Sequence, residues 1–232
     1  MRNASPIFTI ALAFSVGVPG SAQLQKARTI ILVGPPGSGK TVRAEALRKK
    51  YKIPAISMAQ LLREEISRHP QVSAGLAASV ESGELLADGP ANDLVKTRLL
   101  RQDVGKGFIL DGYPASEGQA KVLDQWILDN KLPRPVVVIL DVPEAVSRDR
   151  LTRRRRPGDE SDNIERRLND YREIGRLVEK WYGNERIVRV DGTGAPGDVT
   201  LRIAKGLDAL PTSKELKVRS PEQEGLKQRP PQ

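Results

Sequence analysis

The stretch Gly34-Pro35-Pro36-Gly37-Ser38-Gly39-Lys40-Thr41 decides how the rest of this sequence is interpreted. It fits the G-x-x-x-x-G-K-[ST] pattern of a phosphate-binding loop, in which glycines let several backbone N–H groups converge on a polyphosphate. The apolar run at 29–33 predicts a buried strand before the loop, and the residues from Thr41 onward predict a helix after it. The helix dipole and the Lys40 ammonium add positive potential. The stretch therefore predicts nucleotide binding.

Short apolar runs alternate with helical patterns along most of the chain. We expect strands at 29–33, 55–57, 108–110, 136–140 and 187–190, and helices at 41–51, 58–68, 91–100, 116–130, 143–153, 164–182 and 196–210. Such alternation favours parallel strands joined by right-handed helical crossovers, with ligand-binding loops at the carboxyl edge. The predicted fold class is α/β: a three-layer P-loop NTPase fold with a parallel five-stranded sheet and helices on both faces.

The amino-acid composition limits the kinds of site and ligand that we expect for this chain. The 232 residues allow one α/β domain with extensions at either end. The chain has no cysteine, which excludes disulfides, thiolate catalysis and zinc–thiolate sites. The formal net charge of +9 suits polyanionic ligands, either nucleotides or nucleic acid. The single histidine, His69, lies beside Pro70 in a polar stretch and is interpreted as a solvated turn residue.

Both ends of the chain are interpreted as extensions of the domain. Arg2 precedes an apolar run at 7–18 that is too short to span a membrane, and small residues at 19–22 follow. This is the layout of a secretory signal peptide, although an ordinary buried segment is the alternative. We expect residues 1–22 to be a leader, so that the mature protein is exported or periplasmic; otherwise it is cytoplasmic. Residues 211–232 are polar and contain several prolines, and we expect a disordered tail.

Two further signals favour phosphate chemistry. The 108–110 run leads into Asp111-Gly112, and an aspartate at a strand end can face Mg²⁺ or its waters across from the phosphate loop. An arginine-rich stretch comprises Arg148, Arg150, Arg153, Arg154, Arg155, Arg156, Arg166 and Arg167. Some of these charges are simply solvated, but phosphoryl transfer needs guanidinium groups because charge spreads over the oxygens of the moving group. Nucleic-acid binding competes as an explanation, although no aromatic residues interleave the arginines.

Together these segments resemble the adenylate kinase family of nucleoside monophosphate kinases over about residues 28–210. The ordered matches are the phosphate loop, Ile56-Ser57 with 61–63, 82–88, Asp111-Gly112-Tyr113-Pro114 with Gln119-Ala120, Asp141-Val142-Pro143, 150–154, Arg156, Arg167-Leu168 and 190–193. The resemblance implies a kinase domain at 23–210, with a small helical monophosphate-binding segment at about 57–86 and a short lid at about 154–163. Lid closure would exclude water, and adenylate kinase lids are themselves a well-known example of such gating.

The resemblance also implies the activity and the role of each site residue. Mg·ATP would donate its γ-phosphoryl group to a nucleoside monophosphate, with AMP the leading acceptor. ATP would be held by Gly34, Pro36, Gly37, Ser38, Gly39, Lys40, Thr41, Val42, Arg150, Arg154 and Thr193. The monophosphate would be held by Met58, Arg63, Leu86, Gly112, Gln119, Arg156 and Arg167. Catalysis would fall to Lys40, Arg150, Arg154, Arg156 and Arg167, and Mg²⁺ would be held through waters by Thr41 and Asp111.

The same resemblance leads us to expect small-molecule nucleotides as the partners of this chain. We expect a monomer that binds no nucleic acid. We also expect no stable membrane anchoring after removal of the leader.

Several positions depart from the family pattern. Ala115 stands where a signature arginine would grip the acceptor phosphate. Losing one charged hydrogen bond, worth about 1.5–3 kcal/mol, would weaken acceptor binding roughly ten- to a hundredfold. Arg153 or Arg155 is the candidate for compensation. Met58-Ala59-Gln60 replaces the usual Thr-Gly-Asp, and Met58 makes that edge of the acceptor pocket apolar.

Three alternatives stay open beside the kinase hypothesis. The departures favour a nucleotide-binding member of the family with weakened or lost transfer activity. A P-loop kinase for another small acceptor comes next, but Arg63 and Gln119 together fit a nucleotide acceptor. A basic nucleic-acid module is the last alternative, and it predicts strongly salt-dependent binding of oligonucleotides.

Overall fold

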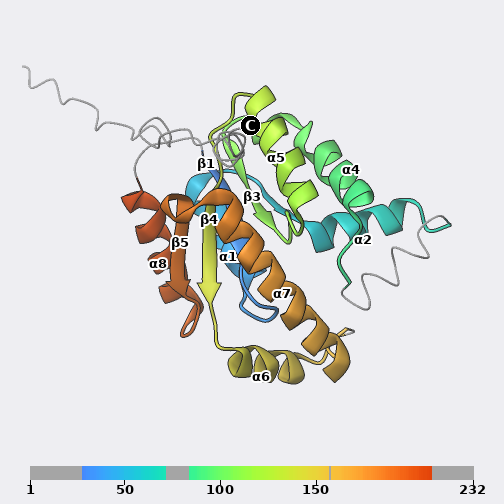
Figure 1. The fold of residues 1–232 in the computed structure, drawn as a ribbon, viewed down its shortest axis with the longest axis vertical. Helices are drawn as coiled ribbons and strands as arrows, with labels where there is room; N and C mark the ends of the chain where they lie inside the picture. Colours follow the sequence, from blue (N-terminus) through green and yellow to red (C-terminus); the bar gives the residue numbers. More distant parts are fainter. Residues whose placement is uncertain (1–27, 72–83, 157, 211–232) are drawn as a thin grey trace, which may run out of the picture.

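The computed structural model describes residues 28–71, 84–156 and 158–210 (Figure 1). The expected leader and tail lie outside the described residues. So do residues 72–83 of the expected monophosphate-binding segment and residue 157 of the expected lid. Within the described ranges, no helix combines the length and apolar character needed to cross a membrane.

A parallel five-stranded sheet forms the centre of the fold, in the order β2-β3-β1-β4-β5 (Figure 1). The strands are β1 (Arg28–Val33), β2 (Ala55–Ser57), β3 (Gly107–Asp111), β4 (Val136–Asp141) and β5 (Ile187–Asp191). Each strand end lies within one residue of its prediction. The predicted α/β fold class is confirmed.

Seven α-helices are described around the sheet, in the part of the chain that the structure covers: α1 (Lys40–Tyr51), α2 (Met58–Arg68), α4 (Asp88–Leu99), α5 (Glu117–Asp129), α6 (Glu144–Arg154), α7 (Ser161–Tyr182) and α8 (Pro196–Ala209). Two short 3₁₀ helices, η1 (Gln102–Val104) and η2 (Asn184–Arg186), precede β3 and β5. The helix α4 begins three residues before its prediction. Gly89-Pro90 is a pair typical of turns, but proline is tolerated in the first turn of a helix, where its missing N–H costs no hydrogen bond. The helix therefore includes both residues.

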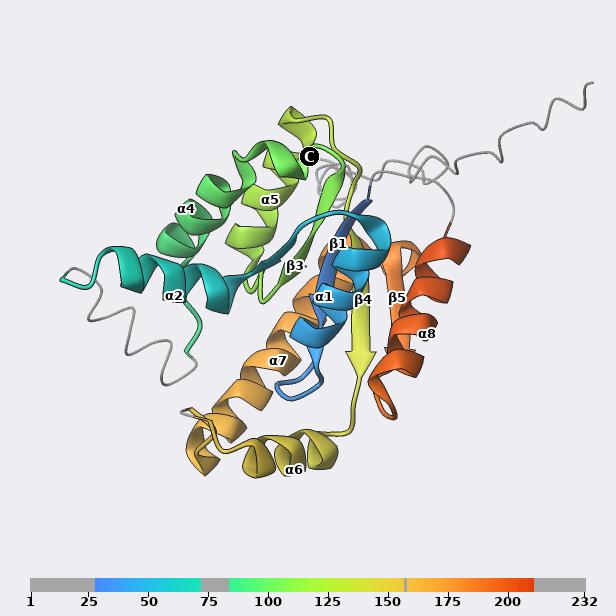
Figure 2. The ribbon, with the colours of Figure 1, turned by 180° about the vertical axis from the view of Figure 1, so that it is seen from behind.

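Side chains along a strand point alternately to opposite sides, so the apolar strands place apolar side chains on both faces of the sheet. Helices cover both faces and bury these side chains. One face, with Ile31 and Leu110 in its centre, packs against α2, α4, α5 and α7. The other face, with Ile30 and Leu32, packs against α1 and α8 (Figure 2). The strands therefore form the buried middle layer of three, which explains their continuous apolar sequences.

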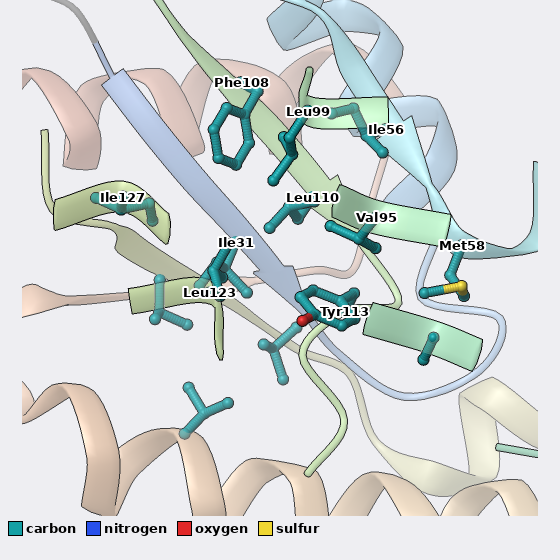
Figure 3. Packing of buried hydrophobic residues seen from close by; sticks show 14 of the residues in the cluster. Ile31, Ile56, Met58, Val95, Leu99, Phe108, Leu110, Tyr113, Leu123 and Ile127 are labelled. Atoms are coloured by element: carbon teal, nitrogen blue, oxygen red, sulfur yellow. The ribbon is translucent and has the colours of Figure 1, made fainter. Parts of the chain in front are cut away.

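Phe108 belongs to the larger core cluster (Figure 3). Its side chain is fully buried, and its ring packs edge-on against Trp126 with 6.0 Å between the centroids. Figure 3 shows it close to Leu99 of α4 and Leu110 of its own strand. Aromatic residues make up only 4% of the chain, so few other side chains are large enough to fill the space that this ring occupies in a close-packed core.

Replacing Phe108 by alanine should lower the free energy of unfolding by about 3–5 kcal/mol, because it removes a buried ring and leaves a cavity. Urea unfolding followed by circular dichroism measures this. The control is Leu128→Ala, since Leu128 is 64% exposed and its truncation should change stability by no more than about 0.5 kcal/mol. Equal effects of the two substitutions would contradict the described core.

Candidate active site

The phosphate loop joins β1 to α1 at the carboxyl edge of the sheet (Figure 1). Gly37 and Gly39 have φ values of 81° and 83°, in the left-handed region that favours glycine. A Cβ at Gly34 would lie 2.8 Å from the Ser38 hydroxyl oxygen and 3.0 Å from Leu140 Cβ. Glycine is thus required at all three positions. The loop ends at the N-terminus of α1, where the free N–H groups and the helix dipole give a positive potential.

Lys40 is the first residue of α1, and its ammonium group bends back over the loop. Its Nζ donates hydrogen bonds to the carbonyl oxygens of Gly34 at 2.7 Å and Pro35 at 3.1 Å. Burial lowers the pKa of Lys40; the Asp111 carboxylate opposes this, while the positive charges of Arg167 and Arg154 add to it. A polyphosphate next to this ammonium would supply the negative charge that favours its protonated form.

Thr41 and Asp111 meet across the site. The Thr41 hydroxyl donates to Asp111 Oδ2 at 2.7 Å, and Asp111 is a buried acid at the end of β3. Mg²⁺ usually binds through one or two carboxylates together with substrate phosphates and waters. A buried carboxylate beside a hydroxyl, at the foot of a phosphate loop, offers that set of oxygen donors. These two residues therefore fit the Mg²⁺ site predicted for them.

A buried carboxylate, Asp159, pairs with one arginine of α6 and one of α7. Its side chain is 1% exposed; it accepts two hydrogen bonds from Arg154, at 2.6 and 2.8 Å, and one from Arg167 at 3.3 Å. The backbone N–H of Arg156 also donates to it, at 3.1 Å. Burial alone would raise the pKa of Asp159, but the hydrogen bonds from Arg154 and from the Arg156 backbone outweigh burial and lower it. Asp159 thus sets the positions of the Arg154 and Arg167 guanidinium groups near the phosphate loop.

These groups surround one cavity of about 730 Å³, bounded by the phosphate loop, the end of β3, α2, α6 and α7. Most of the predicted site residues line it although they are distant in sequence. They are Gly34, Pro36, Gly37, Gly39, Lys40, Thr41, Val42, Met58, Arg63, Asp111, Gly112, Arg150, Arg154, Arg156 and Arg167. The cavity is therefore rich in cations from α1, α2, α6 and α7 and from the segment between α6 and α7.

Four predicted site residues do not line this cavity: Ser38, Leu86, Gln119 and Thr193. Ser38 is fully buried within the loop. Leu86 packs against the larger core cluster. Gln119 is 2% exposed; its Oε1 accepts from the Ala115 N–H at 2.7 Å and its Nε2 donates to Asp88 at 3.0 Å. Thr193 is hydrogen-bonded to Asp191 through both its backbone N–H and its hydroxyl.

The arginine-rich stretch divides into two groups. Arg150, Arg154, Arg156 and Arg167 line the cavity, whereas Arg148, Arg153, Arg155 and Arg166 do not. In the second group, Arg148 pairs with Glu165 and Glu144, and Arg153 with Asp149. The candidates for replacing the arginine missing at Ala115 were Arg153 and Arg155, and neither lines the cavity in this structure.

Sequence reasoning missed several residues that shape the site. Asp159 is the most consequential, since it binds two of the arginines that line the cavity. Glu84, Tyr113, Asp170 and Tyr171 also line it. An acid within an arginine-rich loop was the available signal for Asp159, and such an acid is usually a surface partner.

Replacing Asp159 by asparagine should lower the free energy of unfolding at pH 7 by about 1–2 kcal/mol. Broken buried pairs cost more, but Arg154 and Arg167 are partly exposed and screened. Because folding lowers the pKa of this carboxyl, its stabilisation is present above about pH 4 and is lost as the pH falls through the lowered value.

Urea unfolding from pH 7 down to pH 3 measures this effect. Asp149→Asn, which disrupts an exposed pair with Arg153, is the matched control and should change stability by less than about 0.5 kcal/mol. A loss for Asp159→Asn that is the same at pH 3 as at pH 7 would contradict the ion-pair role.

Comparison with known proteins agrees with this geometry. Residues 32–187 match the Adenylate kinase family model. The adenylate kinase of Bartonella quintana (strain Toulouse) is 34% identical over 188 residues, covering 76% of this chain and 97% of the relative. That of Xanthomonas euvesicatoria pv. vesicatoria (strain 85-10) is 36% identical over 183 residues, covering 77% and 98%. The chain belongs to the adenylate kinase family.

Proposed function

We propose that this chain transfers the γ-phosphoryl group of Mg·ATP to AMP, so that ATP and AMP give two ADP. The observation that carries the proposal is the convergence of Lys40, Arg150, Arg154, Arg156 and Arg167 on one cavity beside the phosphate loop. Membership of the adenylate kinase family supports the same reaction.

The donor nucleotide would bind on the loop side of the cavity. The backbone N–H groups of the loop and the Lys40 ammonium would hold its phosphates. Arg150 lies next to the loop, since its guanidinium donates to the Gly37 carbonyl oxygen at 3.3 Å. Thr41 and Asp111 would hold Mg²⁺ through waters; when bound, this ion neutralises charge on the phosphate oxygens.

The acceptor would bind on the α2 side, where Met58, Arg63 and Gly112 line the cavity. Arg63, Arg156 and Arg167 would hold its phosphate and the group in transfer. Gln119 as a partner of the acceptor base and Leu86 beside it stay predictions, as do Ser38 and Thr193 on the ATP side, because none of these four lines the cavity.

In the transfer step an oxygen of the acceptor phosphate attacks the γ-phosphorus, and the bond to the oxygen that bridges to ADP breaks. The step needs no nucleophile from the protein, so catalysis rests on positioning and on stabilising the charge spread over the transferring oxygens. The guanidinium groups of Arg154, Arg156 and Arg167 meet that need. We propose that the short lid at about 154–163 closes over them and excludes water.

The domain plan is part of the proposal: a kinase domain at 23–210 with a monophosphate-binding segment at about 57–86. Export of the protein, with residues 1–22 as a leader, stays a prediction, and so does its being a monomer.

A second candidate function is nucleotide binding with weakened transfer. The observation that favours it is on the acceptor side, where Ala115 offers no cation and neither Arg153 nor Arg155 lines the cavity. A kinase that acts on another small acceptor is the remaining possibility for a site of this charge.

A coupled assay with AMP, CMP, UMP and GMP on residues 23–232 tests the proposed reaction. We expect AMP to be the best acceptor, and Lys40→Met to lower kcat by about a hundred- to a thousandfold, as for loss of one charge-stabilising donor. Lys49→Met removes an exposed lysine of the same helix and should leave the rate unchanged. Tight ATP binding without turnover on any of the four acceptors would overturn the proposal.

Ala115→Arg should lower the KM for AMP about tenfold or more, because it adds a charged donor next to Pro114, which lines the cavity. The KM for ATP should not change. Ala209→Arg adds the same charge at the exposed end of α8 and controls for net charge. A KM for AMP that does not respond to Ala115→Arg would mean that this position is not where the acceptor phosphate is bound.

A further inference from the structure

Arg43 is a buried cation on the first turn of α1, three residues after Lys40. It is 5% exposed and belongs with Ala44 and Leu47 to the buried side of that helix. The other basic residues of α1 beyond Lys40 lie in its last turn and are exposed: Arg48, Lys49 and Lys50. The last turn is the negative end of the helix dipole, so the positive charges of these three residues are stabilised there. Arg43 lies at the positive end, where a cation is disfavoured.

Arg43 finds no carboxylate to pair with among the described residues. Arg43 Nη1 donates a hydrogen bond to the Gly39 carbonyl oxygen at 3.5 Å, which is the outer limit for such a contact. Its Nε is buried without a hydrogen-bond partner in the described part of the chain. Burial lowers the pKa of Arg43, and the positive charge of Arg150 lowers it further. A buried cation in this state costs folding free energy that a well-packed neutral side chain would not.

Arg43 does not itself line the cavity, but its guanidinium lies against the phosphate loop that bounds it. A Cβ built on Gly39 would lie 2.4 Å from Arg43 Nη1, so the guanidinium packs directly on the bare face of a loop glycine. The other loop cations behave alike: Lys40 donates to the Gly34 and Pro35 carbonyls, and Arg150 to that of Gly37. Three cations are thus bonded to the neutral carbonyls of one loop. Carbonyl oxygens satisfy donors but do not neutralise charge.

We propose that Arg43 is a binding residue for the donor nucleotide and contacts its phosphate chain from the α1 side of the loop. The ligand class is a nucleoside triphosphate, because a polyphosphate beside the loop supplies the anion that Arg43 lacks. The proposal rests on the proposed function only in that ATP is the donor. A purely structural arginine would have the opposite energetic signature, since its removal would destabilise the fold and leave nucleotide affinity alone.

Calorimetric titration with ATP and with β,γ-methylene ATP tests the proposal on Arg43→Gln and Arg43→Lys. Arg43→Gln should weaken the Kd for both nucleotides about ten- to a hundredfold, as for one charged hydrogen bond. Arg43→Lys keeps the charge and should recover part of that loss. The affinity for AMP should stay within twofold of wild type. Arg48→Gln is the matched control, because Arg48 is an exposed arginine of the same helix that pairs with Glu45, and it should bind ATP like the wild type.

Urea unfolding of the same proteins without nucleotide supplies the second readout. Arg43→Gln should unfold at the same urea concentration as the wild type or a higher one, because it removes an uncompensated buried charge. A Kd for ATP within twofold of wild type would overturn the proposal, as would equal losses of ATP and AMP binding together with a lower urea midpoint. Failure to transfer phosphate by a wild type that binds ATP would overturn the proposed function instead, and a wild type that binds no ATP would overturn both.

Discussion

The central position of β1 in the sheet is the constraint on which the site depends. Its parallel pairing with β3 sets Leu32 opposite Asp111, and its pairing with β4 sets Val33 opposite Ile139. The loop that leaves β1 therefore emerges between the carboxyl ends of two neighbouring strands. On one side lies the carboxylate that meets Thr41; on the other, β4 leads into α6 and its arginines. Ligand sites of open α/β sheets lie at such an edge for the same reason.

The second constraint is electrostatic. Two like charges about 6 Å apart repel by roughly 3 kcal/mol at an effective dielectric of 20, so a cavity lined by several arginines and a lysine is unfavourable by itself. Asp159 reduces that cost for Arg154 and Arg167, and loop carbonyls accept hydrogen bonds from Lys40 and Arg150. A polyphosphate neutralises all of these groups at once. The same charges that oppose folding thus favour the ligand, which links stability to nucleotide binding in this chain.

The acceptor and donor sides of the cavity differ in how they depart from a simple family pattern. On the acceptor side, Ala115 supplies no guanidinium, and Met58 contributes an apolar edge. On the proposed donor side, α1 adds Arg43, a buried cation outside the phosphate-loop motif. With the proposed roles, this distribution favours tight binding of the triphosphate over tight binding of the monophosphate. The same distribution is the reason that weakened transfer is the second candidate function.

Much of this protein was determined by local sequence. Five short apolar runs, alternating with helical patterns along the chain, were sufficient to predict five parallel strands to within one residue, because strand formation is signalled by local sequence. Most of the predicted site residues, whose roles the resemblance to the adenylate kinase family implied, line the cavity. Only the tertiary structure decided that Asp159 binds Arg154 and Arg167, and that Gln119 is held by Asp88. Those outcomes depend on how α6 and α7 are rotated against the sheet and on which groups lose water together, and no pattern within one segment contains that information.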